Sequence, residues 1–149
     1  MSPLPQPHVR ALSPLVGRWR TSGSVLDADG AAVAPIRGTD TYRWLTGDAW
    51  LVHEVDVMMG DQHAQALELV GDRDPASGGW LMRAFDASGD FGTMTMTRLD
   101  DGTFLAVGDA VRSLLRPAAD GTSMTAVWEQ ETSPGTWVRW MDMAFARLS

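Results

Sequence analysis

The chain has 149 residues, 44% of them hydrophobic and 21% charged, which indicates one folded domain and excludes intrinsic disorder. Its formal net charge is −7, and all 12 basic residues are Arg. Nucleic acids and anionic membranes are bound through clustered positive charge, so the composition disfavours both as partners. The absence of Lys also excludes Schiff-base chemistry and a Walker-type phosphate loop.

The chain contains no Cys, which excludes disulfides, thiolate metal ligands and cysteine nucleophiles. Its first 15 residues include four prolines and no continuous apolar stretch, so we predict no secretory signal. No apolar run is long enough to span a bilayer as a helix. We therefore expect a cytoplasmic protein.

In chain order, residues 1–11 are expected to form a flexible Pro-rich leader and 12–149 a single domain. The segment 8–15 favours a short helical turn before the first strand. Turn signals that pair Asp or Ser with Gly then recur every 10–15 residues or so, roughly the spacing of β-hairpins.

The segments between these turns alternate with a period of two, as in 93–97 and 124–129. The intervals leave no room for crossover helices. We therefore predict an all-β fold of about ten antiparallel strands. An open sheet would leave two unpaired edges, so closure into a barrel is favoured.

Gly17-Arg18-Trp19 is similar to the opening strand of the calycin superfamily, which includes lipocalins and fatty-acid-binding proteins. Further strings, in order, resemble a bacterial family of lipocalin-like proteins of unknown function. They are Tyr42-Arg43-Trp44-Leu45, Trp50-Leu51-Val52-His53, Gly71-Asp72-Arg73-Asp74-Pro75, Phe85-Asp86-Ala87-Ser88-Gly89, Asp120-Gly121, Trp128-Glu129 and Ala146-Arg147-Leu148. The resemblance covers about 12–148. It implies a calycin-like barrel with an internal cavity and no particular reaction.

Nitrobindin, a heme-binding barrel, is a more distant relative on this resemblance. Its opening pattern, Gly-x-Trp-x-Gly-x-Gly, is matched by Gly17, Trp19 and Gly23, whereas Thr21 replaces the middle glycine. The resemblance places the heme-ligating His near the C-terminus, but this chain has no His after His63. We therefore expect no heme, no metal site and no other cofactor, and we rank heme binding as a minor alternative.

His53 lies in an apolar row with Leu51, Val55, Val57 and Met59, so we expect it to face the cavity as its main titratable polar group. Without an internal carboxylate, burial keeps such a ring mostly neutral. If Asp40 shares the interior, it reverses that expectation by stabilising the charged form. A core His with one hydrogen-bond partner is the alternative.

Seven Trp and nine Met are enough to pack a barrel and also to line a cavity. Arg83 and Arg139 lie on apolar-looking faces, which predicts either an internal carboxylate partner or an anionic group on a ligand. The alternative is that these two Arg residues face outward. The residues expected to bind a ligand are Trp19, Tyr42, Trp44, His53, Trp80, Arg83, Phe85, Trp128, Arg139 and Met141.

These features predict a protein that binds a small, mostly apolar molecule inside the barrel. If Arg83 or Arg139 faces the cavity, that molecule is expected to have an anionic group. One alternative is a cavity enzyme, an isomerase, cyclase or hydrolase that uses His53 with Asp40, Tyr42 or Arg83. Another is an interaction protein with a packed interior, and a homodimer stays open. No catalytic residue is assigned.

Overall fold

A computed structural model describes residues 4–149. A six-residue 3-10 helix, η1, spans Arg10–Leu15 and precedes ten strands. The strands are β1 (Gly17–Leu26), β2 (Ala32–Trp44), β3 (Leu51–Met59), β4 (Gln62–Arg73), β5 (Trp80–Asp86), β6 (Phe91–Arg98), β7 (Phe104–Val107), β8 (Val111–Pro117), β9 (Ser123–Ser133) and β10 (Thr136–Arg147). The all-β fold, the strand number and the short helical turn are as the sequence predicted.

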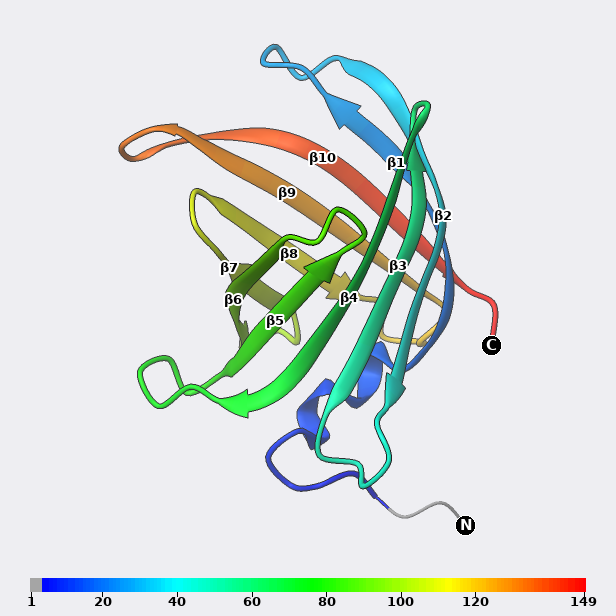
Figure 1. Cartoon of the computed structure of the whole chain (residues 1–149), viewed down its shortest axis with the longest axis vertical. Helices are drawn as coiled ribbons and strands as arrows, with labels where there is room; N and C mark the ends of the chain where they lie inside the picture. Colours follow the sequence, from blue (N-terminus) through cyan, green and yellow to red (C-terminus); the bar gives the residue numbers. More distant parts are fainter. Residues whose placement is uncertain (1–3) are drawn as a thin grey trace.

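Every strand pairs antiparallel with its neighbours in sequence, and β1 pairs with β10 to close the sheet into a barrel (Figure 1). The pairing of Trp19 with Arg147 and of Val25 with Met141 marks the two ends of this closing seam. Closure removes the exposed sheet edges that would otherwise invite pairing with another chain. It also creates an interior bounded on all sides by strands.

The η1 helix lies across one end of the barrel and closes it (Figure 1). Leu12 and Leu15 of η1 are fully buried, and the indole Nε1–H of Trp19 donates a hydrogen bond of 3.0 Å to the carbonyl oxygen of Leu15. The guanidinium of Arg147 covers the Trp19 ring at 4.2 Å and donates to the Val16 carbonyl at 2.8 Å. Trp19 therefore seals the end of the barrel.

Residues 1–3 of the expected leader lie outside the described residues. Val9, also within that leader, is fully buried in the same core as Leu12 and Trp19. The main-chain N–H of Gln6 donates to the carbonyl of Asp48 at 2.9 Å. The chain therefore packs against the barrel well before residue 12, because the end of the barrel needs apolar cover.

Two glycines allow the first strands to bend closely around the barrel. A Cβ at Gly23 would lie 2.0 Å from the Asp142 carbonyl oxygen, and a Cβ at Gly38 would lie 2.2 Å from that of Asp56. Any other side chain at either position would force neighbouring backbone apart. Within residues 4–149, no helix is long and apolar enough to cross a membrane.

Candidate functional site: a barrel cavity with an internal charged cluster

The barrel encloses a cavity of about 150 Å³ whose wall is mostly aliphatic, aromatic and Met side chains. Leu15 lies in its wall at the end closed by η1, and Met59 lies at the far end of β3. Five of the eight Met residues that the structure describes line it, namely Met59, Met82, Met96, Met141 and Met143. Such thioether walls are polarisable and adapt to differently shaped apolar molecules.

Strand β3 contributes an unbroken row to the cavity wall. Leu51, His53, Val55, Val57 and Met59 all line it, as the alternation predicted for this strand. The intervening carboxylates at positions 54 and 56 point to the outer face and are exposed. The structure thus places His53 in the cavity wall.

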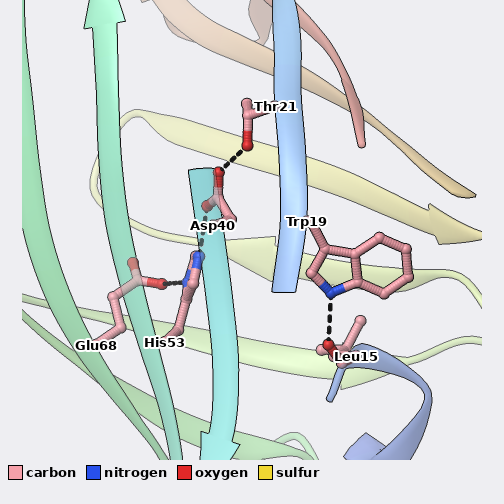
Figure 2. A network of polar contacts seen from close by, with 6 residues as sticks. All are labelled: Leu15, Trp19, Thr21, Asp40, His53 and Glu68. Atoms are coloured by element: carbon pink, nitrogen blue, oxygen red, sulfur yellow. Dashed lines mark hydrogen bonds and ion pairs between the residues drawn. The ribbon is translucent and has the colours of Figure 1, made fainter. Parts of the chain in front are cut away.

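His53 is held between two carboxylates. Its Nε2 lies 2.6 Å from Oδ2 of Asp40 on β2, and its Nδ1 lies 2.6 Å from Oε1 of Glu68 on β4 (Figure 2). The other oxygen of Asp40, Oδ1, accepts a hydrogen bond from the Thr21 hydroxyl on β1. Because these strands are consecutive neighbours, the four side chains form one polar chain across four of the ten strands of the barrel.

Strand register explains why these side chains meet. His53 is directly opposite Glu68 on β4 and directly opposite Tyr42 on β2. Cross-strand partners have their Cβ atoms about 5 Å apart, and diagonal partners such as Asp40 are still within reach of a long side chain. The Tyr42 and His53 rings stack with centroids 3.9 Å apart and planes 8° from parallel.

The two carboxylates set the protonation state of His53. Burial lowers the pKa of this ring, but the charge of Glu68 and the hydrogen bonds to Asp40 and Glu68 outweigh burial and raise the pKa to about 9. Asp40 does share the interior, so the alternative expectation applies, in which an internal carboxylate stabilises the charged ring. His53 is an imidazolium at neutral pH, and both its N–H groups donate to carboxylates.

The cluster carries more negative than positive charge. The side chains of Asp40, His53 and Glu68 are 4%, 11% and 16% exposed, respectively. No Arg contributes to the cavity wall, so His53 is the wall's sole cation among the described residues. With both carboxylates ionised, the wall has a net charge of −1.

Two hydroxyls and one carboxylate oxygen of the wall are open for hydrogen bonding. Tyr42 and Ser113 line the cavity and are only 6% and 4% exposed. Burial raises the pKa of Tyr42 well above its usual value, as do the charges of Asp40 and Glu68, so the phenol keeps its proton. Oε2 of Glu68 is turned away from His53 (Figure 2).

Four of the residues predicted to bind a ligand line the cavity: Tyr42, His53, Trp128 and Met141. Three predicted Trp residues lie elsewhere in the packing. Trp19 seals the closed end, Trp80 donates from Nε1 to the His8 carbonyl at 2.6 Å, and Trp44 packs partly buried against the core. They support the wall and do not form it.

Arg83 and Phe85 do not line the cavity, because the residues of β5 that point inward are the even-numbered ones. Trp80 and Met82 are its buried residues, so Arg83 and Phe85 share the outer face. Arg83 pairs with Asp72 at 2.9 Å between Nη2 and Oδ2, and Phe85 is exposed beside Phe91. The carboxylate partner of Arg83 is therefore external.

Arg139 is also outside the cavity, although Met141, two residues later, lines it. The pairing of β10 with β9 shifts between Arg139 and Met141, so Trp140 is an extra residue that breaks the alternation. Arg139 is exposed and lies 3.5 Å from Asp142 in an ion pair. The bulge explains why the two positions point to different sides.

The sequence did not single out Glu68, Thr21 or Ser113 as site residues. On β4, Leu67 and Leu69 flank Glu68. If these two leucines are assumed to point into the barrel, alternation places the Glu68 carboxylate on the outer face. The structure has the reverse, with Glu68 and Val70 in the cavity wall. The one signal in the sequence was that Ala64 and Ala66 alternate in the same row as Glu68. Both are small and apolar, which is compatible with an inward-facing row.

Within the described part of the chain, no group of three or more His, Cys, Asp or Glu side chains is arranged to hold a metal ion. Asp40, His53 and Glu68 instead satisfy one another by hydrogen bonds. Fold and site together define a closed ten-stranded antiparallel barrel with a mostly apolar cavity and one internal ionic cluster.

A protein-family model matches residues 4–82, slightly more than half of the chain. The chain belongs to this family, which is described as "Protein of unknown function (DUF1579)". The matched segment contains η1, β1 to β4 and the start of β5. It therefore includes all four members of the Thr21–Asp40–His53–Glu68 chain. No curated protein matches the sequence.

Proposed function

We propose that the protein binds a small, mostly apolar molecule inside the barrel. The observation that carries this proposal is a cavity walled mainly by apolar side chains, with its charged groups gathered at one place, on β2 to β4. Ligand sites commonly combine such an apolar wall with a few polar groups that orient the ligand. Here these groups are the hydroxyls of Tyr42 and Ser113 and the Oε2 atom of Glu68, the carboxylate oxygen that His53 does not contact.

Cavity size limits the ligand. The volume of about 150 Å³ is that of cavities which admit a benzene-sized molecule. Drug-sized ligands occupy sites of about 300–1,000 Å³. A single aromatic ring with a short polar substituent therefore fits, whereas a long fatty acid or a retinoid requires side chains to move.

Isothermal titration with benzyl alcohol tests this proposal. We expect binding by the wild type and at least tenfold weaker binding by Ala126→Leu, because Ala126 lines the cavity and a larger side chain fills it, a loss of about 1.4 kcal/mol or more. Ala144→Leu is the matched control, since Ala144 is exposed on β10. Equal binding by both variants, or none by the wild type, contradicts the proposal.

An acid–base enzyme acting in the same cavity is the second candidate. The Glu68 oxygen turned away from His53 and the adjacent protonated Tyr42 supply a base and a hydrogen-bond donor. The reaction class would be proton transfer on a small neutral substrate, as in an isomerase. His53 would position Glu68, because both of its ring nitrogens already contact carboxylates. Hydrogen–deuterium exchange into small ketones, lost in Glu68→Gln, would support this candidate.

The proposal also includes the superfamily of the barrel and the cellular location of the protein. A calycin relationship is supported by Gly17 and Trp19, which carry the resemblance and lie at the closed end of the barrel. Cytoplasmic location rests on the lack of Cys. Heme binding finds no added support, because His53, the one His in the wall among the residues that the structure describes, is held by two carboxylates. A fully packed interior would instead favour an interaction protein.

A further inference from the structure

We propose that the cavity selects a protonated amine on a small apolar body over a neutral or anionic molecule of the same shape. This inference deepens the proposed function and rests on it. The recognising groups are Glu68 and the hydroxyls of Tyr42 and Ser113, and Asp40 adds to the negative charge of the wall.

Charge balance is the first argument. Among residues 4–149, the wall contains two carboxylates and one imidazolium, and no Arg lines it. A buried excess of negative charge is costly unless a cation accompanies it. A ligand ammonium next to the cluster would provide that cation and leave the cavity neutral.

Hydrogen-bonding capacity is the second argument. Both oxygens of Asp40 already accept a hydrogen bond, from Thr21 and His53, whereas Glu68 uses only Oε1 for His53. Oε2 of Glu68 and the hydroxyls of Tyr42 and Ser113 can accept hydrogen bonds, and an ammonium is a pure donor. Tyr42 and Ser113 are each more than nine-tenths buried and line the cavity, so their hydroxyls are placed to accept a hydrogen bond from a ligand.

The remaining wall suits the rest of such a ligand. Trp128 and Phe145 line the cavity together with Met141, so an aromatic ring can pack against aromatic and thioether groups. The arginines that suggested an anionic ligand, Arg83 and Arg139, face outward and pair with Asp72 and Asp142. An anion in the cavity would instead lie near two carboxylates.

Titration calorimetry with benzylamine, benzyl alcohol and benzoate at pH 7 tests the inference. We expect benzylamine to bind the wild type at least tenfold more tightly than benzyl alcohol, which corresponds to about 1.4 kcal/mol, and benzoate to bind most weakly. Binding of benzyl alcohol at equal or higher affinity overturns the amine preference but leaves the proposed function in place. No binding by any of the three overturns both.

A substitution at Glu68 tests whether this side chain causes the preference for benzylamine. Glu68→Gln keeps the shape and removes the charge, so we expect it to abolish the preference for benzylamine over benzyl alcohol. Glu54→Gln removes the same charge from the outer face of β3, where Glu54 is half-exposed, and is the matched control. Loss of the preference in Glu54→Gln, or its persistence in Glu68→Gln, contradicts the assignment to the internal cluster.

A second measurement does not depend on the folding of Glu68→Gln. In the wild type, nuclear Overhauser effects should connect the benzylamine methylene to side-chain protons of Glu68 and Tyr42, and its ring to Phe145. Contacts only with residues of the outer face would overturn the inference.

Discussion

His53 and Glu68 lie directly opposite each other on β3 and β4, and Nδ1 of the imidazolium is 2.6 Å from Oε1 of the carboxylate inside the barrel. Asp40 holds the other ring nitrogen at the same distance. One ring therefore ties together three neighbouring strands of the wall. The cluster contributes to fold stability as well as to the chemistry of the cavity.

The first prediction is a loss of stability at alkaline pH. Burial lowers the pKa of His53, yet the two carboxylates raise it to about 9, above the unfolded value of about 6.5. A raised pKa contributes stability that is fully present below the unfolded pKa and disappears as pH rises through the folded pKa. Urea unfolding should therefore show a free energy of unfolding that falls between pH 6.5 and 9.

NMR titration of the His53 ring provides a direct check of the same effect. Its pKa should fall markedly in Glu68→Gln, and the alkaline loss of stability should become smaller. Working at about pH 9 or below keeps the phenol of Tyr42, the chain's one Tyr, mostly protonated in the unfolded state. A wild-type ring that titrates near 6.5 would show that the carboxylates do not hold it in the charged state.

The second prediction concerns removal of the imidazolium. His53→Leu leaves Asp40 and Glu68 buried without their cation, so the free energy of unfolding should fall by about 3–5 kcal/mol. Adding Asp40→Asn and Glu68→Gln to His53→Leu should restore part of this loss. A single variant as stable as the wild type would mean that the cluster is hydrated and not buried.

The sequence predicted the barrel because the turns and the period of two were regular. It also placed His53 correctly, since β3 alternates without interruption. It failed where a strand departs from the rule that apolar side chains point inward. On β4, Leu67 and Leu69 face outward while Glu68 lines the cavity, because its partner His53 compensates the carboxylate.

Irregular pairing caused the other errors. The bulge in β10 puts Arg139 and Met141 on different sides, and no residue type announces an extra residue at Trp140. The phase of β5 was equally ambiguous, because Leu81 and Phe85 are as apolar as Trp80 and Met82. Contacts between strands, such as Thr21 with Asp40, depend on register, which local sequence does not specify.

The third prediction tests the tight curvature of the first strands. Gly38→Ala places a methyl group against the Asp56 carbonyl, so we expect destabilisation by about 1–3 kcal/mol or more, as for overpacking. Gly92→Ala on β6 is the control, because no atom outside its immediate chain neighbours lies within 4 Å of the added Cβ. Thermal unfolding distinguishes them, and equal melting temperatures would contradict the close approach.

The fourth prediction uses Trp128 as a reporter. It lines the cavity, whereas Trp137 lies on the barrel exterior beneath the Arg112 guanidinium, 4.1 Å from it. Benzyl alcohol should change the intrinsic fluorescence of the wild type and of Trp137→Phe, and the change should be much smaller in Trp128→Phe. A response that depends on Trp137 instead would place the ligand outside the barrel.

The most direct measurement is a crystal structure of the protein grown with saturating benzyl alcohol. The account predicts electron density for the aromatic ring inside the barrel, next to Trp128 and Met141, with the hydroxyl directed to the Glu68 and Tyr42 side of the wall. A cavity filled by rearranged side chains, with benzyl alcohol absent or bound only to the outer surface, would contradict it.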